Sequence, residues 1–271
     1  MIVRGAGGVD IATTDHGGDG VALLLTHGMG GEQAHLDPLV RRLTPRFRVV
    51  TFDMRNHGAS GEGEWTWPLV CEDIAAVRDH YGLDRPVVGG HSLGGMVGVL
   101  FAEADGGVRG VVNIDGHGMG TPDQYVGMTP DEASAALARL RDVQLSLQGE
   151  PSAAIQAMMP TVEALIMFDH YAKVACPQLI FNATAPDPMV NNVEALEWAA
   201  PLMAAYRAGL ERDFAALAAA HPSIEIETMP DAAHYLIFTH ADAVADRIAR
   251  FVSALPPPGP IDARALSCPD A

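Results

Sequence analysis

Apolar residues occur along the chain in short continuous runs, which are separated by turns and by segments with helical spacing. A continuous apolar run is typical of a strand covered on both faces, whereas a half-exposed strand alternates apolar and polar residues. The alternating pattern occurs at residues 9–14 and 224–229. Buried strands are expected at residues 21–26, 47–52, 86–88, 108–114 and 178–182.

Helical patterns follow most of these runs, as at residues 68–81 and 96–103. Strands and helices that alternate at such short intervals predict an α/β fold, with a mostly parallel twisted sheet and helices on both faces. In a sheet of this kind, ligands bind beyond the carboxyl ends of the strands. Residues that directly follow a predicted strand are therefore the first candidates for chemistry.

The pattern changes between residues 119 and 173, where helical segments follow one another without a convincing strand. This stretch predicts a small helical cap that is inserted into the core. A proline-rich run then ends regular structure near residue 256. The predicted division is a core at residues 1–116 and 174–255, a cap at 117–173, and a flexible C-terminal tail at 256–271.

A Gly-x-Ser-x-Gly motif lies between one predicted strand and the helix that follows it, at Gly90, Ser92 and Gly94. A serine at the apex of so tight a turn needs small neighbours, because the incoming strand and outgoing helix crowd each other there. The turn raises the serine hydroxyl above the sheet edge and aims the first N–H groups of the helix at it. Ser92 is therefore the candidate nucleophile.

A serine hydroxyl is unreactive at neutral pH without a base, and imidazole is the usual one. His234 is the best-placed histidine, because it lies after the last predicted strand and before the last helix. His27, His57 and His91 lie beside glycine-rich corners, where bracing of a loop is the simpler interpretation.

The base needs a carboxylate to orient it, and two aspartates follow predicted strands. Asp187 is favoured, because it lies in a loop stiffened by two prolines and gives the chain order Ser, Asp, His. Asp115 is the alternative acid, and its simpler interpretation is a turn before Gly116. The expected oxyanion donors are the backbone N–H groups of Met29 and Leu93.

Composition narrows the classes of partner. The formal net charge is −17, which opposes binding to nucleic acid and to anionic membrane surfaces. No apolar run is long enough to predict a membrane span, and the N-terminus lacks the layout of a secretory signal. Three scattered cysteines indicate a reducing compartment, so a cytoplasmic location is expected. The sequence shows no metal-ligand cluster and no cofactor motif.

Taken together, four motifs make the chain resemble the α/β-hydrolase superfamily over roughly residues 8–255. They are His-Gly-Met-Gly-Gly at 27–31, Asp-x-Arg-Asn-His-Gly-x-Ser at 53–60, Gly-His-Ser-Leu-Gly-Gly at 90–95, and Ala-Ala-His at 232–234. The resemblance implies a triad of Ser92, Asp187 and His234, a cofactor-free acyl-enzyme mechanism, and a cap that governs specificity. The long helical stretch between the acid and the base departs from the family pattern.

The function expected from these features is a serine hydrolase that cleaves a small to medium apolar carboxylic ester or lactone. Serine at the elbow argues against epoxide hydrolases and dehalogenases, which carry aspartate there in this family. A thioesterase, a carbon–carbon bond hydrolase and a cofactor-free perhydrolase use the same triad and stay open. The alternative from another class is a non-catalytic protein that binds a small molecule on a hydrolase scaffold. The sequence does not indicate an oligomeric state.

Overall fold

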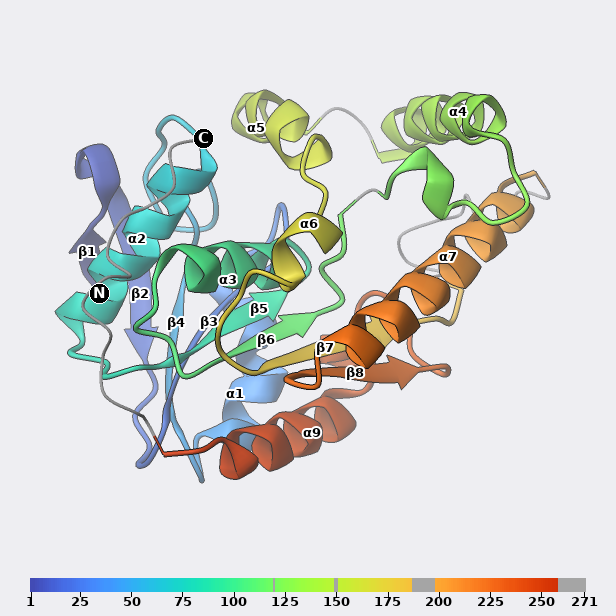
Figure 1. The fold of residues 1–271 in the computed structure, drawn as a ribbon. Coiled ribbons are helices and arrows are strands. Elements are labelled where there is room, and N and C mark those ends of the chain that lie inside the picture. The colour runs from blue at the N-terminus through green and yellow to red at the C-terminus, as the bar shows by residue number, and fades with distance from the viewer. Residues whose placement is uncertain (119, 149–150, 187–197, 258–271) are drawn as a thin grey trace.

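The apolar runs form one sheet in the computed structural model, which describes residues 1–118, 120–148, 151–186 and 198–257. The strand order across the sheet is β1 (Ile2–Arg4), β2 (Asp10–Asp15), β4 (Arg48–Phe52), β3 (Ala22–Thr26), β5 (Val87–His91), β6 (Gly110–Ile114), β7 (Gln178–Ala183) and β8 (Ile224–Met229). Strands β1 and β2 are antiparallel to their neighbours, and the other strands are parallel. This arrangement confirms the predicted mostly parallel sheet (Figure 1).

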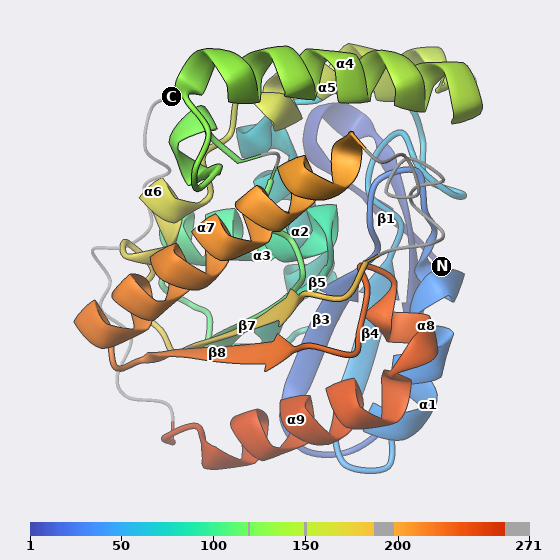
Figure 2. The same ribbon diagram turned by 90° about the vertical axis from the view of Figure 1, so that its right-hand side faces the viewer.

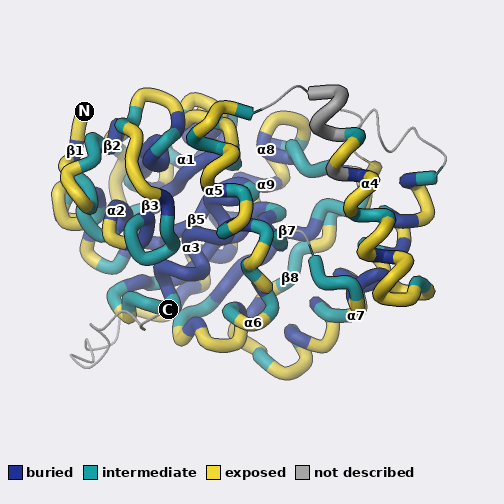
Figure 3. The backbone as a smooth tube through the Cα atoms, turned by 90° about the horizontal axis from the view of Figure 1, so that it is seen from above, coloured by how far each residue is buried: buried dark blue, intermediate teal, exposed yellow. Residues whose placement is uncertain are grey.

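Helices cover both faces of the sheet, because successive side chains of each strand point to opposite faces. In β3, Leu24 joins the apolar cluster beneath the helices α2 and α3, while Leu23 and Leu25 join the cluster beneath α1 and α9. The four helices are α1 (Asp37–Leu43), α2 (Trp67–His80), α3 (Leu93–Ala104) and α9 (Ala241–Ala254). Figure 3 shows the buried positions concentrated along the central strands and α3, with exposed positions on the outer helices.

A group of helices stands over the carboxyl ends of the strands. It consists of η3 (Pro122–Gln124), α4 (Pro130–Gln148), α5 (Ala153–Glu163) and α6 (Phe168–Tyr171). The long helix α7 (Ala199–Ala220) runs from this group down to β8, as Figures 1 and 2 show. Near its start, Ala199 and Leu202 pack with Tyr125, Ala133 and Leu140 of the upper group. A helix from outside residues 117–173 thus contributes to the roof over the sheet.

The division of the chain into a cap at 117–173 and a core on either side of it stays a prediction. The predicted tail at 256–271 lies outside the described residues from residue 258 onward. Among the helices that the structure describes, none combines the length and the apolar character needed to cross a lipid bilayer. The cytoplasmic location therefore stays a prediction as well.

The strand order reverses between β3 and β5. From β3 the chain moves outward to β4, and it then returns across the sheet to β5, which pairs with β3 on its other side. A crevice forms at such a switch point, because the connections leave the two neighbouring strands in opposite directions. The corner after β3 at residues 27–31 and the corner after β5 at residue 92 both open into it. Residues at the ends of β6, β7 and β8 border the same region.

Candidate active site

Ser92 occupies the turn between β5 and α3, with a φ of 53° and a ψ of −118°. This is a strained conformation for a residue that carries a side chain. The turn is held by the Ser92 N–H, which donates to the Ile114 carbonyl of β6 at 2.8 Å. Gly90 and Gly94 make it sterically accessible, because a Cβ at either position would collide with the Thr26 carbonyl oxygen of β3. The backbone thus exposes the serine hydroxyl at the sheet edge.

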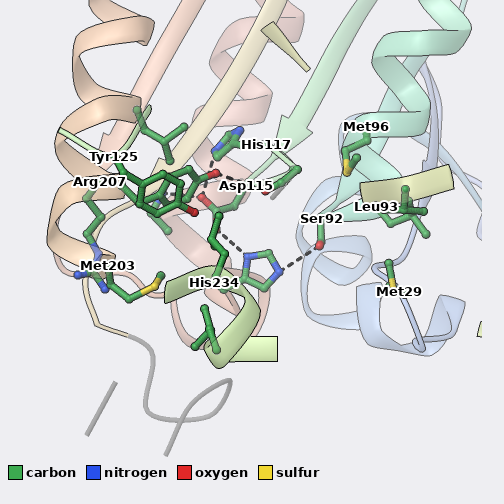
Figure 4. A pocket seen from close by; sticks show the side chains of 18 of the residues that line it. Met29, Ser92, Leu93, Met96, Asp115, His117, Tyr125, Met203, Arg207 and His234 are labelled. Atoms are coloured by element: carbon green, nitrogen blue, oxygen red, sulfur yellow. Dashed lines mark hydrogen bonds and ion pairs between the residues drawn. The ribbon is translucent and has the colours of Figure 1, made fainter. Parts of the chain in front are cut away.

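His234 reaches the serine from the opposite side of the crevice. It lies in the loop between β8 and the short helix α8 (Leu236–Thr239). Its Nε2 atom lies 3.0 Å from the Ser92 Oγ atom, within hydrogen-bond distance (Figure 4). This is the separation at which an imidazole can take the proton of a hydroxyl as that hydroxyl attacks a carbonyl carbon.

Asp115 lies behind His234, directly after β6. Its Oδ2 atom accepts a hydrogen bond from the His234 Nδ1–H at 2.7 Å, and its Oδ1 atom accepts one from the Ala183 N–H at 2.8 Å. A positive φ of 59° turns the residue away from the strand direction. Burial alone would raise the pKa of the Asp115 carboxyl, but the imidazoles of His117 and His234 outweigh it and hold that pKa well below its usual range. The carboxylate is therefore ionised and oriented.

His117 is a further polar residue beside this carboxylate. Its Nε2 atom lies 3.3 Å from Asp115 Oδ1, and its Nδ1 atom lies 3.3 Å from the hydroxyl of the buried Tyr171. The same hydroxyl accepts a hydrogen bond from the amide of Asn113 in β6 at 3.0 Å. His117 itself is buried. The aspartate thus has one imidazole on each of its two oxygens.

Met29 and Leu93 lie on the serine side of the site, as Figure 4 shows. Leu93 is the first residue of α3, so its N–H has no acceptor within the helix. The corner that carries Met29 packs closely on the elbow, because a Cβ at Gly28 would lie 3.1 Å from the Ser92 Cβ. The assignment of these two N–H groups as oxyanion donors stays a prediction.

A cavity of about 300 Å³ opens above Ser92, between the sheet edge and the helices over it. Ser92, Asp115 and His234 all border it. Most of the other lining side chains are apolar, among them Met96, Leu137, Leu140, Val162, Met203 and Leu210. Tyr125 and Arg207 add polar groups at the end away from the serine (Figure 4), and Tyr206 also lines the cavity. Within the described part of the chain, no group of three or more His, Cys, Asp or Glu residues is arranged to hold a metal ion.

Comparison with known proteins identifies the family. A model described as the alpha/beta hydrolase family matches residues 23–247. The chain belongs to that family. Its similarity to the esterase YbfF of Escherichia coli is 29% identity over 148 residues, which is 54% of this chain and 56% of the esterase. The chain spans between 26% and 56% of the length of eight curated relatives that it matches.

Solved structures share the fold of this alpha/beta hydrolase at low sequence identity. The enol-lactonase from Burkholderia xenovorans LB400 has a TM-score of 0.65 at 18% identity, covering 93% of this chain and all of that one. An esterase from Exiguobacterium antarcticum has a TM-score of 0.67 at 16% identity, covering 94% of this chain and 99% of that one. These findings confirm both the predicted resemblance and the predicted fold class.

The structure brings three of the predicted residues of this hydrolase together: Ser92, His234 and Asp115, which the sequence offered only as the alternative acid. The favoured acid, Asp187, lies outside the described residues. Sequence reasoning missed His117. The signal available for it was its position two residues after a strand end that already carried a candidate acid.

The three histidines at glycine-rich corners lie against backbone, as the bracing interpretation predicts. The Nδ1–H of His27 donates to the Gly28 carbonyl at 2.8 Å, and its Nε2 atom accepts the Met54 N–H at 3.1 Å. The Nδ1–H of His57 donates to the Arg55 carbonyl at 2.9 Å. The Nε2–H of His91 donates to the carbonyl of His234 at 2.7 Å.

Proposed function

We propose that this chain is a serine hydrolase that cleaves small to medium, largely apolar carboxylic esters or lactones through an acyl-enzyme. The observation that carries the proposal is the unbroken pair of hydrogen bonds from the Ser92 Oγ through the His234 ring to the Asp115 carboxylate. We take Asp115 as the acid of the triad. A serine, a histidine and an ionised aspartate in this order are the minimum set for nucleophilic acyl transfer.

In the first half of the reaction, the Ser92 Oγ attacks the carbonyl carbon of the ester while His234 Nε2 takes the hydroxyl proton. Asp115 stabilises the imidazolium that results and keeps its ring in place. The carbonyl oxygen becomes negative and accepts hydrogen bonds from the N–H groups of Met29 and Leu93. The tetrahedral intermediate then expels the alcohol, which takes the proton from His234, and the acyl group stays on Ser92.

In the second half, a water molecule attacks the acyl-enzyme. His234 takes a proton from that water, and the tetrahedral intermediate then breaks its bond to Ser92. The serine oxygen recovers its proton from His234, and the carboxylic acid leaves. No group beyond these side chains and backbone donors is needed for the cycle.

The size and lining of the cavity support the substrate class. A volume of about 300 Å³ is at the lower end of the range for small-molecule sites, and most of the lining side chains are apolar. A short acyl or alcohol group therefore fits better than a long chain. The names of the E. coli esterase and the enol-lactonase are consistent with esters and lactones as the class.

The test is a series of p-nitrophenyl esters from acetate to octanoate, with Ser92→Ala as the matched variant. We expect the highest kcat/KM for the short acyl chains and a loss of about 10⁵-fold or more in kcat for Ser92→Ala. A fluorophosphonate probe should label the wild type and not the variant. Equal turnover by Ser92→Ala would refute the mechanism. Tight small-molecule binding with no hydrolysis of any ester would favour the non-catalytic alternative.

A further inference from the structure

The residue immediately before the nucleophile contacts the base. His91 is the last residue of β5 and is buried, with 3% of its surface exposed. Its Nε2 atom lies 2.7 Å from the carbonyl oxygen of His234, which is 143 residues away in the chain. A carbonyl oxygen only accepts hydrogen bonds, so Nε2 must carry the proton. This contact fixes the tautomer of His91.

The His91 ring also packs against the base and against the oxyanion corner. Its centroid lies 4.7 Å from that of the His234 ring, at an interplanar angle of 44°. On another side, a Cβ at Gly28 would come within 3.0 Å of the His91 Nδ1 atom. Three loops of the site therefore meet at one side chain: the elbow after β5, the corner after β3 and the loop after β8.

We propose that His91 is a positioning residue that sets the distance between His234 and Ser92. This inference rests on the function proposed above, because it assigns a role only if His234 acts as the base. His91 is joined to Ser92 by one peptide bond at the end of a buried strand. Its N–H donor is thus placed rigidly relative to the nucleophile, and it holds the backbone of the base from there.

Loss of the His91 donor should affect the rate of the reaction, because that rate depends steeply on the positions of the reacting groups. A shift of about 1 Å in a reacting group costs about 100-fold in rate, whereas substrate binding in the apolar cavity does not depend on the donor. His234 lies in a connecting loop rather than in a strand or helix. The hydrogen bond from His91 ties the His234 carbonyl oxygen to the end of β5, so the backbone that carries the imidazole moves less than a free loop would. Loss of the anchor should therefore lower kcat and leave KM nearly unchanged.

The first experiment compares His91→Phe, which keeps a ring but removes the donor, with His91→Gln, which keeps an N–H donor. The matched control is His57→Phe, because His57 is also a buried histidine that donates to a backbone carbonyl, outside the site. We expect kcat to fall at least 10-fold in His91→Phe with KM within about twofold, and His91→Gln to recover part of the loss. His57→Phe should keep the wild-type kcat.

A kcat for folded His91→Phe within twofold of the wild type would overturn the proposal, as would an equal loss of kcat in His57→Phe. Should His91→Phe fail to fold, His91→Leu tests the same loss of the donor with a smaller side chain. The second measurement is the downfield proton resonance of the His234 Nδ1–H in Ser92→Ala, which needs no turnover. We expect the resonance to disappear when His91→Phe is added.

The two readouts separate this inference from the proposed function. If the wild type neither hydrolyses esters nor reacts with the fluorophosphonate, the hydrolase proposal fails, whatever the variants at His91 show. If the wild type is active and Ser92→Ala is inactive, but the resonance and kcat survive in His91→Phe, only the positioning role fails.

Discussion

The Asp115 Oδ2 atom lies 2.7 Å from the His234 Nδ1 atom, although the two residues are 119 positions apart in the chain. Asp115 directly follows β6 and His234 follows β8, so one strand, β7, lies between these two in the sheet. That strand supplies the second anchor, because the N–H of Ala183 at its end donates to the other carboxylate oxygen at 2.8 Å. The aspartate is thus held on both oxygens before any substrate binds.

Replacing Asp115 by Asn should lower kcat by about 10⁴-fold with little change in KM, because an amide leaves the imidazole in the wrong tautomer. The parallel variant is Asp187→Asn, for which we expect a far smaller loss. Steady-state kinetics on a p-nitrophenyl ester measure both, and circular dichroism checks that each variant folds. A larger loss in Asp187→Asn than in Asp115→Asn would contradict the assignment of the acid.

Most of the sheet was predictable from the sequence because buried strands leave a simple pattern. The continuous apolar runs correspond to β3 to β7, and the two alternating runs correspond to β2 and β8. The three-residue strand β1 was not predicted, because so short a segment has no periodicity to detect. Ser92 and His234 could be proposed from the sequence because the elbow motif is local and because the order of strands and helices limits where the base can lie.

The acid could not be chosen from sequence, because Asp115 and Asp187 both follow a predicted strand. Periodicity places a residue at a sheet edge, but it does not say which way the side chain points once the strand has ended. At Asp115 that direction depends on a positive φ of 59°. His91 contacts the loops after β3 and β8, and His117 contacts Tyr171 of α6 as well as Asp115, so these contacts became visible only in the folded chain.

Removing the imidazole of His117 should shift the acid limb of the kcat/KM profile to higher pH. The His117 ring helps to hold the pKa of Asp115 low, with its Nε2 atom 3.3 Å from Oδ1. In His117→Phe the carboxylate loses this partner and its pKa rises, so Asp115 takes up a proton at a higher pH than in the wild type. We expect a shift of about half a pH unit to one pH unit. His117→Gln, which keeps a donor, should shift less. A profile identical to that of the wild type would exclude this role.

A methyl group at Gly28 should impair catalysis more than stability. The added Cβ would lie 3.0 Å from His91 Nδ1 and 3.1 Å from Ser92 Cβ, so the corner or the elbow must move by a few tenths of an ångström. We expect Gly28→Ala to lower kcat about 10-fold to 100-fold. The control is Gly82→Ala after α2, where φ is positive and a Cβ meets nothing within 4 Å, so only stability should fall, by about 1 kcal/mol. An unchanged kcat in Gly28→Ala would contradict this prediction, because it would mean that the corner moves without displacing Ser92 or His91.

The free energy of unfolding should fall steeply as the pH is lowered from about 6.5 toward 4. Burial lowers the pKa of His27 to about 4 and that of His91 to about 3, from an ordinary value of 6.5. In that window the unfolded chain binds protons that the folded chain does not, so acid favours unfolding. Each of the two histidines contributes a slope of up to about 1.4 kcal/mol per pH unit, and their contribution is absent above the window because both states are then neutral.

Urea unfolding at a series of pH values measures this slope directly, and His91→Gln isolates one of the two histidines. Glutamine does not titrate, so the variant should lose up to about 1.4 kcal/mol per pH unit of the slope between pH 6 and 4. Above pH 7.5 its curve should run parallel to that of the wild type, because the imidazole is uncharged there in both states. Equal slopes for the two proteins below pH 6 would mean that the buried ring accepts a proton without opening the fold. Burial of His91 and the nearby His234 imidazole both lower the pKa of the ring, and they argue against that outcome.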